Sequence, residues 1–196
     1  MPSLIRGFPE AQRDQAARLY WEAFGGKLGT VLGPEPRALA FLGRILRADH
    51  CFSVLDDDGQ LIGIAGYKSP QGGFAAGGFP QMRAAYGGFG ALWRSLALWT
   101  LSHEVDNERF LIDGIAVTRR ARGLGVGTAL IEALCAEARQ RGYKAIRLEV
   151  IDSNIRARAL YARLGFVPLR TDRLGPLALL FGFRAATTMV RGLDED

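Results

Sequence analysis

A glycine-rich turn between two apolar segments is the part of the chain best suited to hold an anion. The turn reads Arg-Gly-Leu-Gly-Val-Gly over residues 122–127, and a helical pattern follows it directly. Glycines let the backbone curl so that successive N–H groups point at one anion, and the start of a helix adds partial positive charge. Arg119, Arg120 and Arg122 add full charges nearby. A pyrophosphate is the expected ligand; the alternative is a turn that serves helix–strand packing alone.

Two familiar phosphate-binding motifs do not fit this turn. A P-loop ends in Gly-Lys-Ser/Thr, whereas Gly127 is followed directly by Thr128. A GxGxxG dinucleotide turn needs a third small residue, where this chain has Thr128 or Leu130. Asp152 does stand where a ribose-binding acid is expected, so a nucleotide-dependent oxidoreductase is kept as a weaker alternative.

A third pattern does fit. Arg/Gln-x-x-Gly-x-Gly/Ala is matched by Arg122, Gly125 and Gly127, and further along Leu-Glu-Val precedes Asn154. An Ala-Leu-Tyr-x-x-x-Gly-Phe segment then ends at residue 166. In these motifs and spacings residues 111–166 resemble the GCN5-related N-acetyltransferase (GNAT) superfamily. The resemblance covers over a quarter of the chain strongly, and the order of the other expected elements agrees with it.

The resemblance implies an enzyme that moves the acetyl group of acetyl-CoA directly onto a primary amine of a small molecule, peptide or protein. The turn would hold the pyrophosphate, the strand before it would pair its edge with the pantetheine amides, and an asparagine would bind the cofactor arm. That asparagine is also well placed to cap the helix that follows. The cofactor-binding residues implied are Ile115, Ala116, Val117, Arg122, Gly123, Leu124, Gly125, Val126, Gly127, Thr128 and Asn154.

Three side chains are candidates for the proton transfers of such a reaction. Tyr161 matches the family's general acid, since a phenol of pKa about 10 can protonate the leaving thiolate; its apolar helix face is also typical of a core tyrosine. Glu149 is the first candidate base, because its spacing matches the Glu of ribosomal-protein N-terminal acetyltransferases, and the alternative is an ion pair with Arg147. Asp113, an acid inside an apolar strand, is the second candidate base, the alternative being a hydrogen bond at the strand edge. The N–H of Val117 or a neighbour is the expected oxyanion donor.

Hydrophobic periodicity predicts the elements that position these residues. Together with the resemblance it predicts one α/β (α+β) domain over residues 3–192. Its mixed, mostly antiparallel central sheet has about six to seven strands, flanked by helices, with a splay between the two central strands. Strands are expected at 3–8, 51–55, 61–67, 109–117, 144–151, 166–169 and 185–190, and helices at 9–25, 37–48, 91–102, 128–141 and 154–164.

Two glycine-rich stretches are predicted to lie outside the regular elements. The first helix is expected to end near Gly25-Gly26, which leaves a loop over Gly25–Gly33. Glu22 and the neighbouring aromatic side chains could bind a cationic amine acceptor there, and the alternative is that they only pack at the helix end. Residues 71–90 are expected to form a Gly-rich insertion, either a loop or loosely helical, because residues 72–90 alone contain seven glycines. Such a segment is either an active-site lid or a surface excursion.

Composition excludes several functional classes. Hydrophobic residues make up 48% and charged residues 23% of the chain, as in ordinary globular proteins. No apolar run approaches the roughly 18 residues of a membrane span, and the N-terminal segment has no signal-like core. We therefore expect a cytoplasmic protein that does not bind a membrane. Cys51 and Cys135 lie in apolar patterns and the chain has two histidines, so we expect buried structural cysteines and no metal site.

The charge is concentrated in one segment. Residues 109–173 carry 13 Lys and Arg against 6 Asp and Glu, although the whole chain has a net charge of only +5. This asymmetry indicates an anionic ligand, and in the absence of any groove-reading motif we expect no nucleic-acid partner. A non-catalytic sensor of CoA with the same fold is the alternative to an enzyme. Dimers are common among proteins of this resemblance, so a homodimer is one expected state.

Overall fold

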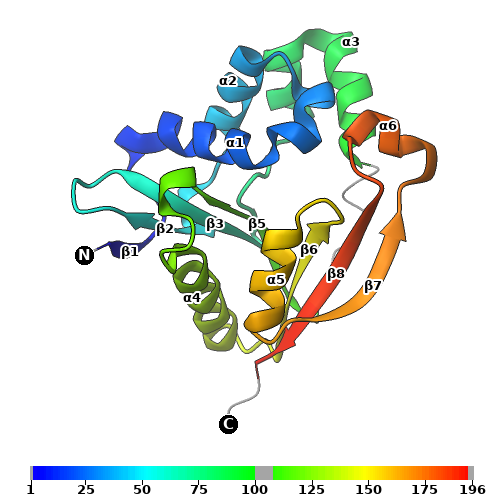
Figure 1. The fold of residues 1–196 in the computed structure, drawn as a ribbon. Coiled ribbons are helices and arrows are strands. Elements are labelled where there is room, and N and C mark those ends of the chain that lie inside the picture. The colour runs from blue at the N-terminus through cyan, green and yellow to red at the C-terminus, as the bar shows by residue number, and fades with distance from the viewer. Residues whose placement is uncertain (1, 100–107, 194–196) are drawn as a thin grey trace.

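A twisted sheet with helices on both faces forms the frame of the molecule (Figure 1). The computed structural model describes residues 2–99 and 108–193. In this part of the chain the strands lie in the order β1-β2-β3-β5-β6-β8-β7, with the short β4 on β3. All neighbours are antiparallel except β5 and β6, so the predicted mixed, mostly antiparallel sheet is confirmed. The strands are β1 (Ser3–Arg6), β2 (Cys51–Leu55), β3 (Leu61–Ser69), β4 (Gly72–Gly73), β5 (Phe110–Val117), β6 (Ala145–Ile151), β7 (Val167–Arg173) and β8 (Ala185–Gly192).

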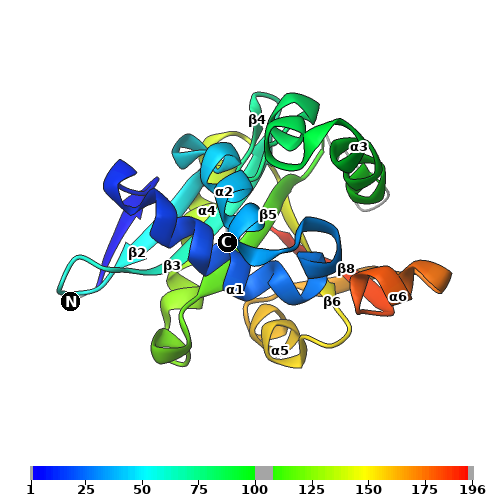
Figure 2. The ribbon, with the colours of Figure 1, turned by 90° about the horizontal axis from the view of Figure 1, so that it is seen from above.

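The helices divide between the two faces of the sheet. From above, α1 and α2 overlie β3 and β5 (Figure 2), and α4 and α5 lie side by side on the opposite face (Figure 1). Short 3-10 turns at 10–12, 48–50, 119–121 and 175–177 join some of these elements. The helices are α1 (Arg13–Leu32), α2 (Glu35–Ile45), α3 (Phe79–Trp99), α4 (Val126–Gln140), α5 (Ile155–Arg163) and α6 (Ala178–Phe181).

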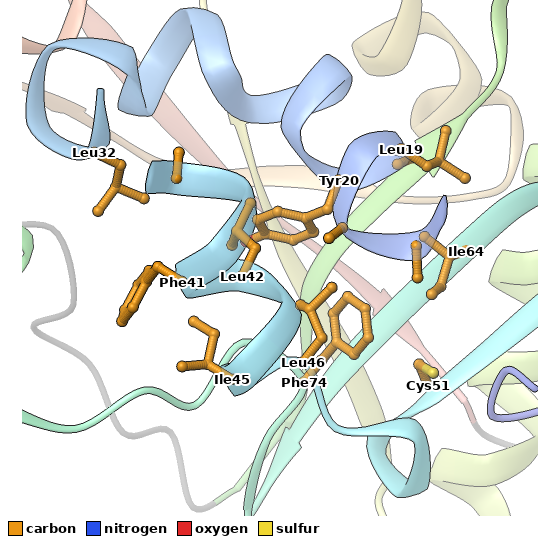
Figure 3. Packing of buried hydrophobic residues seen from close by; sticks show 14 of the residues in the cluster. Leu19, Tyr20, Leu32, Phe41, Leu42, Ile45, Leu46, Cys51, Ile64 and Phe74 are labelled. Carbon is orange, nitrogen blue, oxygen red and sulfur yellow. The ribbon is translucent and has the colours of Figure 1, made fainter. Parts of the chain in front are cut away.

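Each face of the sheet therefore has its own hydrophobic core. The first core lies under α1, α2 and α3, and Figure 3 shows Tyr20 of α1 and Phe74 packed with Leu42 of α2 and with Leu46, which directly follows α2. The second core lies under α4 and α5 and includes Tyr161 and Phe166. Even-numbered residues of β6 face this second core, while Glu149 and its odd-numbered neighbours face the other side, as strand alternation requires.

The first helix is longer than its sequence predicts. It continues through Gly25 and Gly26 to Leu32, so the expected loop over Gly25–Gly33 is wrong. Each glycine costs a helix about 1 kcal/mol relative to alanine. Val31 and Leu32 are almost fully buried, and burying one such side chain contributes about 1.5–3 kcal/mol. Tertiary packing at the end of the helix thus outweighs the weak propensity in its middle.

The glycine-rich stretch over 72–90 is more ordered than a loop. It contains β4 and the first half of α3, which begins at Phe79, so its loosely helical interpretation is the one that the structure supports. Gly87 interrupts the helix with φ 72° and ψ 175°, and Ala91 beyond it is fully buried. Residues 100–102 of the helix expected at 91–102 lie outside the described residues. Neither α3 nor any other described helix combines the length and the apolar composition needed to cross a bilayer.

Candidate active site

The opening between β5 and β6 is the central feature of the site. Only two pairs join these parallel strands, Phe110 with Ile146 and Leu111 with Arg147, although β5 has eight residues and β6 has seven. On its other edge β6 is paired with β8 along its whole length. The two central strands therefore separate beyond Leu111, and the splay expected from the sequence is confirmed.

The edge of β5 presents its backbone to this opening. Thr118 donates its N–H to the carbonyl of Ile62 at 2.9 Å, at the end of the β3–β5 ladder. Alternate residues of an antiparallel ladder bond to the same neighbour, so Ala116 also turns its N–H and C=O toward β3. Ile115 and Val117 turn theirs to the opposite edge, into the opening. Two of the three expected strand residues thus offer polar backbone groups there, and Ala116 does not.

The glycine turn closes one end of the opening with a shape that only small residues adopt easily. Gly123 and Gly125 have φ values of 80° and 81°, in the left-handed region, and Gly125 is the N-cap of α4. A Cβ added at either glycine would have no atom within 4 Å. The first N–H groups of α4, at Val126, Gly127 and Thr128, have no acceptor inside the helix. The turn thus combines open space around its glycines, the start of α4 and backbone N–H groups without acceptors. This combination suits the binding of an anion such as a pyrophosphate.

Arginine side chains surround the turn, but they are not equivalent. Arg119, Arg120 and Arg122 are all exposed. Arg122 donates from Nε to the carbonyl of Val117 at 3.3 Å, which ties the turn to the end of β5. Arg120 forms a 2.8 Å ion pair with Asp56 in the β2–β3 hairpin, so part of the positive charge is already compensated.

The start of α4 lies against α5. A Cβ added at Gly127 would come within 3.1 Å of Cδ2 of Leu160, so this glycine allows close contact between the two helices. Asn154 is the N-cap of α5, and its Oδ1 accepts a hydrogen bond from the N–H of Ala157 at 3.2 Å. The capping role considered for Asn154 is thus present. The same side chain is exposed at the edge of the opening.

Tyr161 lies in α5 and is part of the second core, on the α4 and α5 side of the sheet. Its side chain is only 9% exposed, and its ring lies 5.9 Å from that of Phe166. Burial raises the pKa of Tyr161 to about 12. Within residues 2–99 and 108–193, no group forms a hydrogen bond with its hydroxyl. The residue is therefore both a core side chain and a phenol that keeps its proton at neutral pH.

Glu149 lies on the opposite face of the sheet from the α5 side. Its side chain is 43% exposed, and a carboxylate oxygen lies 3.5 Å from Nη2 of the buried Arg147. The ion pair considered as an alternative is therefore present, although 3.5 Å is long for a strong charged hydrogen bond. Glu149 and Tyr161 thus lie on opposite faces of the sheet.

Asp113 occupies a special backbone position. The β3–β5 register shifts between Gly66 and Tyr67, so Asp113 is the extra residue of a β-bulge in β5. Its carboxylate accepts the N–H of Ala75 at 3.0 Å and lies 3.4 Å from Nζ of Lys68. These partners, which hydrophobic patterning could not reveal, hold the carboxylate in place and lower its availability as a base.

Aromatic side chains of α1 cover the bulge. A Cβ added at Gly114 would lie 2.7 Å from Cζ of Phe24, so the glycine makes room for this ring. The rings of Tyr20 and Phe24 lie 4.5 Å apart, and burial, together with the negative charge of Asp113, raises the pKa of Tyr20. Tyr20 and Phe24 are among the aromatic residues that flank Glu22 in the sequence, but the contact with Gly114 could not be inferred from spacing. Glu22 is exposed on the outer face of α1.

The cysteines lie outside this site. Cys51 and Cys135 are free and buried, as predicted, and Cys51 is buried in the first core. Burial, with a smaller contribution from the charge of Asp49, raises the pKa of the Cys51 thiol to about 12. Among the described residues, no three His, Cys, Asp or Glu side chains are grouped so that they could hold a metal ion.

Known proteins share this sequence pattern and this architecture. The model of the Acetyltransferase (GNAT) family matches residues 13–166. The Xenopus tropicalis protein named "Probable N-acetyltransferase camello" is 38% identical over 76 residues, and this match spans 39% of the chain but only 34% of the Xenopus protein. A Corynebacterium glutamicum structure described as histone acetyltransferase HPA2 and related acetyltransferase superposes with a TM-score of 0.67 at 21% identity, covering 100% of this chain and 98% of the other.

One further solved structure contains the expected ligand. An acetyltransferase from Bacillus anthracis in complex with acetyl coenzyme A has a TM-score of 0.51 and 22% identity, over 74% of this chain and 62% of that one. At such identities the structural matches establish the fold alone. The family model, however, covers most of the chain, and the opening between β5 and β6 next to the glycine turn agrees with it. The chain belongs to the GNAT family of acetyltransferases.

Proposed function

We propose that the protein is an acetyl-CoA-dependent N-acetyltransferase that acts on a primary amine of a small molecule, peptide or protein. One observation carries the proposal: the two-pair ladder between β5 and β6 leaves the backbone of β5 open directly beside the glycine turn. A bound acetyl-CoA would supply an activated acetyl group. The acetyl-CoA complex of the Bacillus anthracis acetyltransferase supports this choice of co-substrate.

Backbone groups would bind the co-substrate along the opening. Ile115 and Val117 would pair with the two pantetheine amides, as another strand would. The N–H groups from Gly123 to Thr128 would hold the pyrophosphate, with Arg122 adding charge. Asn154 would contribute its side-chain N–H₂ while its Oδ1 stays bonded to Ala157. The N–H of Val117 also suits an oxyanion, because it is a fixed donor at the edge of the opening.

Two side chains would move the protons. Glu149 would accept a proton from the acceptor ammonium, since it is the more exposed of the two candidate carboxylates and its ion pair is long. Asp113 is the second candidate, because Lys68 and Ala75 already hold it. Tyr161 would donate its proton to the departing thiolate, and its raised pKa keeps it protonated at neutral pH. The buried cysteines take no part, so transfer is direct.

A titration followed by a turnover assay tests this function. The purified protein is titrated calorimetrically with acetyl-CoA, and with NAD as a parallel control. Saturable binding of acetyl-CoA alone is expected, followed by release of CoA thiol when a panel of primary amines is added. Absence of acetyl-CoA binding would overturn the proposal, and binding without turnover on any amine would favour a CoA sensor.

A further inference from the structure

The two sides of the glycine turn differ in charge. On one side lies the β2–β3 hairpin, whose tip contains three consecutive acids at 56–58, and Asp56 is paired with Arg120. On the other side lies α5, whose nine residues include three exposed arginines and no acid. In the described part of the chain, none of these three arginines, Arg156, Arg158 and Arg163, forms an ion pair. A multiply charged anion near the turn is therefore attracted toward α5 and repelled by the hairpin.

Helix geometry places two of the three arginines on the side of α5 that faces α4. Leu160 is the α5 residue that meets Gly127 at the start of α4. Residues three or four apart share a helix face, so Arg156 and Arg163 lie on the α4 side with Leu160. Arg158 is two residues from Leu160 and lies on the other flank of the buried stripe, next to Tyr161. The α4 side of α5 thus carries two arginines, one in its first turn and one in its last.

The position along α5 separates these two. β5 and β6 are parallel, so α4 and α5, which follow them, both begin at the same edge of the sheet (Figure 1). Arg156 lies in the first turn of α5, close to the glycine turn, and helical side chains lean toward the N-terminus. Arg163 lies seven residues further on, about 10 Å down the helix at about 1.5 Å per residue. Of the two arginines on the α4 side of α5, Arg156 is therefore the nearer to a group that projects beyond the turn.

We propose that Arg156 binds the phosphate that CoA carries on its ribose and so makes the enzyme prefer CoA to dephospho-CoA. The inference rests on the proposed function, which places the pantetheine along β5 and the pyrophosphate at the turn. The nucleotide end must then project beyond the turn, where its third phosphate meets either the acidic hairpin or α5. The guanidinium of Arg156 offers a planar pair of N–H donors that matches two phosphate oxygens.

Calorimetric titrations of CoA and dephospho-CoA into three proteins test this assignment. The three proteins are the wild type, Arg156→Gln and the matched control Arg158→Gln. The control removes the same charge from the other flank of α5. We expect the wild type to bind CoA about three- to fivefold more tightly than dephospho-CoA, which is the gain expected from one exposed charged contact. Arg156→Gln is expected to lose most of this preference while its affinity for dephospho-CoA stays unchanged. Arg158→Gln is expected to keep the preference.

Each other result has a distinct meaning. Equal loss of affinity for both ligands in Arg156→Gln would overturn the assignment, because the side chain would then act on the pyrophosphate. Equal binding of both ligands by the wild type, or an equal loss of preference in Arg158→Gln, would overturn it as well. If the wild type binds neither ligand, the proposed function itself fails. Both arginines are exposed, so thermal unfolding of the two variants should match the wild type.

Discussion

Leu111 and Arg147 form the last backbone pair between β5 and β6, and both strands continue beyond it without each other. The β-bulge at Asp113 begins two residues after Leu111. A bulge bends its strand and increases the local twist, so it turns the rest of β5 away from β6. The opening is thus a consequence of one inserted residue in β5, while β8 keeps β6 in the sheet.

Gly125→Glu should abolish acetyl-CoA binding. The residue must adopt a left-handed conformation, which costs other residues about 1–2 kcal/mol, and the new carboxylate would stand where the pyrophosphate is proposed to bind. We expect at least about a 100-fold loss of affinity, which corresponds to roughly 2.7 kcal/mol, measured by calorimetry. Gly142→Glu is the control, since Gly142 has φ 79°, also has open space around its Cβ, and follows the other end of α4. Equal losses in both variants would mean that backbone strain, not the anion site, is the cause.

Tyr161→Phe should separate turnover from binding. Its hydroxyl has no hydrogen-bond partner among the described residues, so its removal should leave the melting temperature and acetyl-CoA affinity unchanged. Loss of a general acid should lower kcat by about 100-fold. Because burial raises the pKa of Tyr161 to about 12, the wild-type rate should show no alkaline decline caused by this residue below pH 10. Tyr143→Phe is the control, because the ring of Tyr143 packs against Phe110 at the start of β5. Full activity in Tyr161→Phe would refute the acid role.

Glu149→Gln and Asp113→Asn distinguish the two candidate bases. We expect Glu149→Gln to lower kcat by about 100-fold or more with little change in stability, since the carboxylate is exposed and its ion pair long. Asp113→Asn should mainly destabilise the fold, by about 1–2 kcal/mol, because Lys68 loses its partner and the bulge loses a charged acceptor. Rate measurements and chemical denaturation of both variants decide the assignment. A large rate loss only in Asp113→Asn would reverse it.

Local signals predicted much of this fold. The hairpin between β2 and β3 follows from an Asp-Gly tip, and α4 with its glycine turn follows from a strand, a glycine run and an apolar stripe in succession. The capping role of Asn154, one of the two roles expected for it, is predictable because an N-cap is a local interaction. The splay between β5 and β6 could be predicted only from the resemblance to the GNAT superfamily. The hydrophobic periodicity of the two strands does not show that they separate.

The features of the fold that the sequence does not predict depend on contacts between segments that are distant in the chain. The bulge at Asp113 is invisible in the sequence because its partners, Lys68 and Ala75, come from β3 and the chain after β4. The second half of α1 was missed because Val31 and Leu32 are buried against other elements, and Tyr86 of α3 donates its hydroxyl to the carbonyl of Leu32. Helix propensity does not include these tertiary contacts, and therefore it predicts that α1 ends too early, near Gly25.

Gly26→Ala should stabilise the protein, because α1 is helical at this position and an added Cβ meets no atom within 4 Å. Alanine favours the helix by about 0.8–1 kcal/mol over glycine, so the free energy of unfolding should rise by nearly that amount. Gly25→Ala is the matched comparison, since its Cβ would lie 3.0 Å from Cε2 of Trp21 and would force the ring to shift. Chemical denaturation measures both. A destabilised Gly26→Ala would mean that α1 ends near Gly25 after all.

Glu137 anchors an ion pair that links α4 to the first strand and should make stability depend on pH. Arg6 and Arg141 both donate to its carboxylate, the latter at 2.7 Å. Burial raises the pKa of Glu137, but hydrogen bonds and charges from the two arginines outweigh burial and hold it below the usual value of about 4.5. A lowered pKa stabilises the folded state above about pH 4.5, and this contribution is lost as the pH falls through the lowered pKa.

Glu137→Gln should therefore destabilise the protein at pH 7 and much less in acid. We expect about 2 kcal/mol at pH 7, less than for a fully buried pair because Arg6 is half exposed. The difference from the wild type should shrink as the pH falls below 4. Glu10→Gln is the control, because its pair with Arg13 is at the surface and its removal should change little. Denaturation at pH 7 and pH 3.5 measures the effect, and a difference independent of pH would show that packing, not charge, explains the loss.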